Sequence, residues 1–279
     1  NFGLSDSEVQ SLVSVYKPDL FVNKRVLISG ASSGIGKATA WLFARLGAEV
    51  ILVARNPEKL AAVQAQFAAA KMKSHAYTLN IRDHDQVVSV QQEIAKELGG
   101  IDALINSAGG QFPKPALDIT QRGWEAVVDT NLNGTWYMMQ NAAKHWKASG
   151  KPGCIVNIVT VVDRGMVDMA HSCAARAGVI HLSKTVAVEW APLSVRVNCI
   201  APGVISSEGM QVYDDNAREK FPLSNPMKRM GSPWDIAQAA VYLASDASAF
   251  MTGDTITLDG GGRLWGELWP FKQPDYFKL

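Results

Sequence analysis

The stretch Ser29-Gly30-Ala31-Ser32-Ser33-Gly34-Ile35-Gly36 decides the fold of this chain. It follows the apolar run 26–28 and precedes a run of helix-forming residues at 37–46. Glycines allow a tight turn and let the backbone come close to a ligand. A strand, a glycine turn and a helix in this order seat a phosphate on the helix N-terminus, where N–H groups favour an anion. The stretch therefore predicts a dinucleotide-binding unit.

Strand-like and helix-like segments alternate along the rest of the chain. We expect strands at residues 26–28, 50–53, 76–79, 103–105, 155–159, 195–200 and 255–258. We expect helices at residues 37–46, 57–70, 85–98, 123–146, 174–190 and 233–243. Nearly continuous apolar strands that alternate with helices indicate a parallel sheet covered on both faces. The predicted fold class is therefore α/β, a Rossmann-like doubly wound parallel sheet of about seven strands with helices on both faces.

No linker or repeat divides the chain, so we expect a single catalytic domain over residues 25–262. A lead-in at 1–24 precedes it, and a tail at 263–279, rich in Trp, Phe and Pro, follows it. The tail either packs on a neighbouring subunit or lines the substrate pocket. The segment 205–230 is polar and irregular and follows a strand end, so it is predicted to be a mobile lid over the site.

Composition and charge argue against several classes of partner. The 279 residues carry 27 basic and 26 acidic side chains, for a net charge of +1, which favours neither nucleic acid nor an anionic membrane. No apolar run approaches the roughly 20 residues of a membrane span. Three sparse cysteines and the lack of a signal-like first segment predict a cytoplasmic protein without disulfides. No metal site is expected.

The end of the second predicted strand indicates which dinucleotide is bound. It reads Leu52-Val53-Ala54-Arg55-Asn56. In NAD sites a carboxylate at this point holds the ribose 2′-hydroxyl, and here Ala54 occupies that position. Arg55 follows, and arginine pairs with a 2′-phosphate that a carboxylate would repel. The strand end predicts NADP(H), unless Arg55 is only a solvated residue that begins a loop.

Three further motifs follow in a fixed order. Asn106-Ser107-Ala108-Gly109 comes after the fourth predicted strand, Asn131-Leu132-Asn133-Gly134 lies in the long helix, and Pro202-Gly203 comes after the sixth strand. Together with the glycine turn, they resemble the short-chain dehydrogenase/reductase family over residues 22–262. The resemblance implies a small-molecule substrate and a homotetramer packed through helices 123–146 and 174–190 and the last strand. It implies cofactor contacts from Gly30, Ser32, Ser33, Gly34, Ile35, Gly36, Arg55, Asn80, Ile81, Asn106, Ala108, Gly109, Arg176, Pro202, Gly203 and Val204.

The catalytic positions depart from the family pattern. The family usually carries Tyr-x-x-x-Lys at the start of the helix after strand five, and a serine just after that strand. Here Arg176 stands at the lysine position and Ser172, beside His171, at the tyrosine position. The serine position falls on Thr160 or Val159. The catalytic tyrosine and lysine are therefore both absent.

The departure itself resembles one branch of the family. The string His171-Ser172-Cys173-Ala174-Ala175-Arg176-Ala177-Gly178 is similar to the trans-2-enoyl-CoA and 2,4-dienoyl-CoA reductases. Gly109-Gly110-Gln111-Phe112 and Asn80-Ile81-Arg82 are similar to the same branch. Bacterial relatives of this branch include chains assigned to terpenoid alcohols such as citronellol, so the branch leaves the substrate open.

Serine and arginine suit the reduction of a conjugated C=C bond better than the oxidation of an alcohol. Alcohol oxidation needs a base, and a serine hydroxyl and a protonated arginine are poor bases. C=C reduction needs hydrogen-bond donors at the thioester oxygen that becomes an enolate oxygen. Ser172, Thr160 or His171 would supply them. His171 or water would give the α-carbon its proton, and Arg176 would hold the ribose hydroxyls.

Structural roles remain open for the same residues. His171 and Ser172 also fit a helix start, where Ser172 would be the N-cap. Asn131, a catalytic candidate by its motif, also fits a polar residue inside a helix. The predicted function is an NADPH-dependent reductase of 2-enoyl-CoA-type substrates. The alternatives are an NADP(H)-dependent alcohol dehydrogenase or ketoreductase, and a cofactor-binding protein with little turnover.

Overall fold

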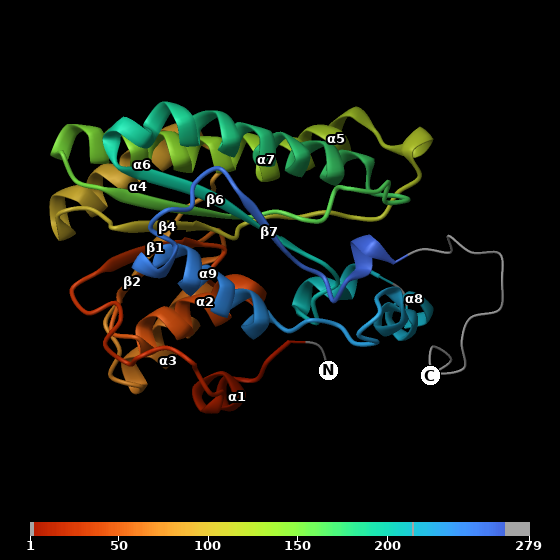
Figure 1. Ribbon diagram of the computed structural model, residues 1–279, viewed down its shortest axis with the longest axis horizontal. Coiled ribbons are helices and arrows are strands. Elements are labelled where there is room, and N and C mark those ends of the chain that lie inside the picture. Colours follow the sequence, from red (N-terminus) through yellow and green to blue (C-terminus); the bar gives the residue numbers. More distant parts are fainter. Residues whose placement is uncertain (1–2, 214, 266–279) are drawn as a thin grey trace.

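A single parallel sheet of seven strands forms the centre of the molecule. The computed structural model describes residues 3–213 and 215–265 (Figure 1). The strand order is β3-β2-β1-β4-β5-β6-β7, and every neighbouring pair is parallel. The predicted fold class is confirmed. The strands are β1 Arg25–Ser29, β2 Glu49–Ala54, β3 Ser74–Thr78, β4 Ala103–Asn106, β5 Gly153–Ile158, β6 Val195–Pro202 and β7 Thr255–Leu258.

Helices cover both faces of the sheet. In Figure 1, α4, α6 and α7 lie on one side, and α2, α3 and α9 lie on the other. The α-helices are α1 Asp6–Ser11, α2 Gly34–Arg45, α3 Pro57–Ala69, α4 His84–Leu98, α5 Gln121–Val128, α6 Gly134–Ser149, α7 Ala170–Trp190, α8 Asp215–Lys220 and α9 Pro233–Ala244. A π-helical segment, Asp129–Asn133, joins α5 to α6. Short 3₁₀ helices are Ala116–Asp118, Ala191–Leu193, Glu208–Val212, Phe221–Ser224, Asp246–Ser248 and Gly262–Leu264.

The apolar strand runs are explained by burial on both faces. Along β1, Val26 and Ile28 belong to the core on the side of α2 and α9, whereas Leu27 belongs to the core beneath α4 and α6. All three side chains are fully buried. Because successive residues of a strand point to opposite faces, a strand covered on both sides has no polar alternation.

Several element boundaries differ from the predictions. The expected helix 123–146 is two helices around the π-helical segment. The lead-in contains α1, whose Ser5 and Glu8 form a capping box. Strand β3 begins at residue 74 rather than 76, and β5 spans 153–158 rather than 155–159. Helix α7 begins at residue 170 rather than 174, because residues 170–173 continue its hydrogen-bonding pattern.

The segment 205–230, which stays a predicted lid, consists largely of short helices. It contains the 3₁₀ helix Glu208–Val212, then α8, then Phe221–Ser224. It follows β6 and lies at the carboxyl ends of the strands (Figure 1). The predicted tail beyond Trp265 lies outside the described residues. Within residues 3–213 and 215–265, no helix is long and apolar enough to cross a membrane.

Candidate active site

Two glycines of the turn between β1 and α2 are packed too closely for side chains. Gly30 has φ +70°, and a Cβ there would lie 2.8 Å from the backbone N of Ala108. A Cβ on Gly36 would lie 2.3 Å from the Gly30 carbonyl oxygen. The Ser29 hydroxyl accepts hydrogen bonds from the N–H groups of Ser107 and Ala108, at 3.2 and 3.1 Å. The turn after β1 and the turn after β4 therefore form one backbone cradle.

A carboxylate occupies the N-terminus of α2. The Gly34 N–H donates to Glu208 Oε2 at 2.8 Å, and the N-cap residue Ser33 makes no side-chain cap bond. Ser33 is exposed, and its neighbours Ser32 and Ile35 are half-buried. An anion is favoured at this end of a helix by the free N–H groups and the helix dipole. The cradle thus fits the phosphates of a dinucleotide, with Glu208 already using one of its donors.

The end of β2 carries the two residues on which the cofactor prediction depends. Ala54 is buried at the end of β2, and Arg55 is exposed beside it. Among the described residues, the Arg55 side chain has no hydrogen bond or ion pair. Asn80 follows β3 and accepts a hydrogen bond from the Arg82 N–H at 3.3 Å. Ile81 is buried, and its side chain fills the space above Gly134.

The side chain of Asn106 points across the sheet. Its Nδ2 donates to Asn157 Oδ1 on β5 at 2.8 Å, and Asn157 donates in turn to the Ser183 hydroxyl of α7 at 2.9 Å. Asn106 Oδ1 is buried without a partner among the described residues. Asn106 therefore links the cradle to the sheet interior. The sequence analysis did not single out Asn157.

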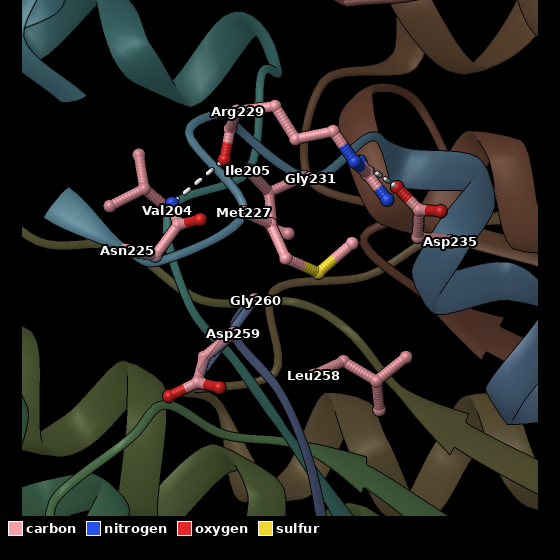
Figure 2. Close-up of a pocket in the computed structure, with 10 residues that line it drawn as sticks. All are labelled: Val204, Ile205, Asn225, Met227, Arg229, Gly231, Asp235, Leu258, Asp259 and Gly260. Atoms are coloured by element: carbon pink, nitrogen blue, oxygen red, sulfur yellow. Dashed lines mark hydrogen bonds and ion pairs between the residues drawn. The ribbon is translucent and has the colours of Figure 1, made fainter. Parts of the chain in front are cut away.

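The motif after β6 borders a separate cavity. Gly203, after Pro202, donates its N–H to the Leu258 carbonyl oxygen at 2.9 Å, and Val204 lines a cavity of about 210 Å³. Figure 2 shows this cavity, with the Arg229–Asp235 ion pair of 3.1 Å on one side and Leu258 on another. None of the predicted catalytic residues lines it.

Arg176 and Asn131 are brought together by α7 and the π-helical segment. Arg176 donates from Nη1 to the Ile158 carbonyl oxygen at 2.7 Å and from Nη2 to Asn131 Oδ1 at 3.3 Å. Its guanidinium lies against Gly109, where a Cβ would be 2.5 Å from Nη2. Burial lowers the pKa of Arg176 to about 10, so the side chain is a cation at neutral pH. No described carboxylate forms an ion pair with it.

Asn131 also makes hydrogen bonds to the turn after β4. Its Oδ1 accepts the Gly110 N–H at 3.0 Å, and its Nδ2 donates to the Gly110 carbonyl oxygen at 2.8 Å. The side chain is only 2% exposed. π-helical turns are uncommon and often occur at functional sites. The widened turn places the Asn131 amide between the turn and Arg176, a structural contact that also reaches the predicted catalytic cation.

Ser172 is joined to two residues that sequence analysis did not select as site residues. Its hydroxyl donates to Gln111 Oε1 at 2.8 Å, and Gln111 Nε2 donates to the Tyr213 hydroxyl oxygen at 2.8 Å. Met169 is the N-cap of α7, so the alternative role of Ser172 as an N-cap is wrong. Gln111 lies in a motif quoted above, which was a usable signal. Tyr213 carried none beyond being the first tyrosine after Tyr137.

His171 and Thr160 stand apart from this network. His171 is fully buried, accepts the Ser172 N–H at Nδ1 (2.9 Å) and packs edge-on against Phe112. Its Nε2 has no partner among the described residues. This arrangement favours the local role over proton donation. Thr160 is half-buried beyond β5, whereas Val159, the other candidate for that position, is buried and pairs with Ile200.

Comparisons with known proteins identify what this chain resembles. The family model described as enoyl-(acyl carrier protein) reductase matches residues 30–262. A Bacillus subtilis protein named probable 2,4-dienoyl-CoA reductase, of the (2E)-enoyl-CoA-producing type, is 37% identical over 89% of this chain and 99% of its own.

Two solved structures resemble the whole described fold. The citronellol catabolism dehydrogenase of Pseudomonas aeruginosa is 37% identical, with 90% of this chain and 99% of that chain covered and a TM-score of 0.81. An Agrobacterium tumefaciens structure with bound NADP, provisionally named a 2-deoxy-d-gluconate 3-dehydrogenase, is 30% identical. It covers 90% of this chain and 100% of its own, with a TM-score of 0.81. The names of these relatives span different substrate classes.

Proposed function

This chain belongs to the short-chain dehydrogenase/reductase family of oxidoreductases, and from that membership we propose that it reduces the C=C bond of 2-enoyl-CoA-type substrates with NADPH. The observation that carries the proposal is the contact of Arg176 with Asn131, with Ser172 standing where the family has tyrosine. This set of residues offers a cation and hydrogen-bond donors, and it lacks a base.

The cofactor would be held by the cradle and the strand ends around it. Backbone N–H groups of residues 33–36 would bind its diphosphate, and exposed Arg55 would pair with a 2′-phosphate. Ala54 removes the carboxylate that would repel that phosphate. The Agrobacterium tumefaciens relative with bound NADP is in keeping with this choice.

When bound, the reduced nicotinamide supplies a hydride to the substrate β-carbon, which leaves negative charge on the thioester oxygen. The residues of this chain act on that charge. Arg176 is a cation at neutral pH without an ion-paired carboxylate among the described residues, so its field favours the anionic state of the substrate. The α-carbon then takes a proton from water.

Alcohol oxidation fits these side chains less well. The Ser172 hydroxyl donates a hydrogen bond to Gln111 Oε1, and it would have to lose that proton to act as a base. The guanidinium of Arg176 has no lone pair available at neutral pH. The runner-up is nevertheless an NADP(H)-dependent alcohol dehydrogenase or ketoreductase, because a protein named citronellol catabolism dehydrogenase is 37% identical to this chain.

A substrate panel tests the proposal. Purified protein is assayed with crotonyl-CoA and a simple ketone in the presence of NADPH, and with citronellol in the presence of NADP⁺. We expect kcat/KM to be largest for the enoyl thioester. Oxidation of citronellol without reduction of crotonyl-CoA would establish the dehydrogenase instead, and cofactor binding without any turnover would establish the third alternative.

We also propose that the protein is a homotetramer that packs through α5, α6 and α7 and strand β7. Apolar side chains are exposed on two of these helices: Trp124 on α5 is 42% exposed and Val188 on α7 is 77% exposed. Burying such side chains between subunits removes apolar surface from water. Sedimentation at micromolar concentration tests this, and a monomer would contradict it.

A further inference from the structure

Ser172 stands at the position of the family's tyrosine, but its side chain by itself cannot contact a substrate. Ser172 is 1% exposed in the first turn of α7. Its hydroxyl proton is engaged by Gln111 Oε1 at 2.8 Å. A group further along the same network can instead offer a donor to the substrate oxygen.

Gln111 gives that network a direction. An amide has distinct ends, an accepting oxygen and a donating nitrogen. The oxygen accepts from Ser172, so the nitrogen faces Tyr213 and donates to its hydroxyl oxygen at 2.8 Å. A phenol that accepts this bond keeps its own O–H for another acceptor. That O–H donates to no described residue.

The network is continuous with the cation proposed to act on the substrate. Gln111 follows Gly110, whose N–H and C=O are both bound by Asn131. Asn131 in turn contacts Arg176. One short turn after β4 therefore fixes both Tyr213 and Arg176, with Gln111 and Gly110 as adjacent anchoring points.

Tyr213 is held in a state suited to donation. Its ring packs edge-on against Phe221, with ring centroids 5.1 Å apart. Burial raises the pKa of Tyr213, so its phenol stays protonated at neutral and mildly alkaline pH. The same segment carries Glu208, which binds the Gly34 N–H of the cradle. The segment thus contacts both the cofactor cradle and the turn after β4.

We propose that Tyr213 is a catalytic residue that donates a hydrogen bond to the substrate carbonyl oxygen as charge develops there, and that Gln111 is the positioning residue that directs its O–H. This inference rests on the proposed function. It puts a tyrosine from the segment 205–230 in place of the tyrosine missing from α7. No proton leaves Tyr213 in this role, since the α-carbon takes its proton from water.

The first test removes only the hydroxyl. Tyr213→Phe keeps the ring that packs on Phe221, and Tyr242→Phe, at an exposed tyrosine of α9, is the matched control. We expect kcat of Tyr213→Phe to fall about 100-fold, the scale of one oxyanion donor, with an unchanged Kd for NADPH and an unchanged melting temperature. A kcat equal to that of the control would overturn the role of Tyr213.

The second test reverses the direction of the network. In Gln111→Glu, a carboxylate can accept from both Ser172 and Tyr213, so both contacts persist while the Tyr213 proton is drawn away from the substrate. We expect kcat to fall as far as in Tyr213→Phe, whereas KM for NADPH and thermal stability remain unchanged. If Gln111 merely held the segment in place, Gln111→Glu would retain the wild-type kcat, and the positioning role would be overturned.

Both tests use whichever substrate the wild-type protein turns over in the panel. Crotonyl-CoA turnover with an unaffected Tyr213→Phe would overturn the role of Tyr213 and leave the proposed function standing. Turnover of a carbonyl compound alone, with a loss of kcat in Tyr213→Phe, would overturn the proposed substrate and support the role of Tyr213. No turnover with any substrate would overturn both.

Discussion

The cradle after β1 is lined by backbone atoms. Side chains instead line the neighbouring region at the carboxyl ends of β4 and β5 and the start of α7, which we call the edge. Within the cradle, Gly36 lies so close to Gly30 that a side chain has no room. At the edge, Asn131, Arg176, Gln111 and Tyr213 come from four separate segments. Backbone contacts depend on the path of the chain rather than on the identity of most side chains. Side-chain contacts can be exchanged while the path stays the same, so this family member can differ in its chemistry and keep its fold.

The largest effect is expected from a substitution that disrupts the cradle. Gly36→Val would place a branched side chain where even a Cβ lies 2.3 Å from the Gly30 carbonyl oxygen. The turn would have to move, and overpacking of this kind costs about 1–3 kcal/mol in stability. We expect NADPH binding to become undetectable by fluorescence titration. Gly165→Ala, at a glycine with no atom within 4 Å of an added Cβ, should bind NADPH as the wild type does.

The next largest effect is expected from a substitution that removes a charged side chain from the edge and leaves the cradle unchanged. Arg176→Met removes the cation that contacts Asn131 and keeps a side chain of similar length. We expect kcat/KM for crotonyl-CoA to fall about 100-fold, the scale reported for loss of one group that stabilises an oxyanion. Arg122→Met, at an exposed arginine of α5, serves as the control. Equal kcat/KM values for the two variants would show that catalysis does not depend on Arg176.

A smaller effect concerns the choice of cofactor. Arg55→Ala combined with Ala54→Asp should weaken NADPH binding by about 1.5–3 kcal/mol, since a charge-assisted pair is lost and a carboxylate is added. NADH binding should change little or improve, because the new carboxylate can hold a ribose hydroxyl. Isothermal titration with both cofactors measures the shift. A wild-type protein that binds NADH as tightly as NADPH would contradict the role given to Arg55.

The smallest effect concerns the carboxylate at the cradle. Glu208→Gln removes a negative charge from the N-terminus of α2, where Glu208 accepts the Gly34 N–H. Since the pair is exposed, we expect a gain in NADPH affinity of only about 0.5–1 kcal/mol, and a smaller gain at high salt. Glu58→Gln, at an exposed residue of α3, is the control. Weaker binding by Glu208→Gln would show that Glu208 assists the cofactor rather than competes with it.

Local signals predicted most of the fold. Strands such as β1 and β2 follow from contiguous apolar runs, and the glycine turn is a local backbone requirement. The π-helical segment was missed because Asp129–Asn133 contains no Gly or Pro that would interrupt a predicted helix. The early start of α7 was missed because Ser172 fits an N-cap, whereas the N-cap in the structure, Met169, makes no side-chain bond.

The sequence by itself determined the order of strands and helices, the cradle at residues 29–36 and the identity of the side chains that replace tyrosine and lysine. All of these are properties of neighbouring residues. Only the tertiary structure decided that Gln111 meets Tyr213, 102 residues away, and that Arg176 meets Asn131, 45 residues away. Hydrogen bonds between distant segments depend on where the folded backbone brings donor and acceptor within about 3 Å, and no local pattern in the sequence encodes that distance.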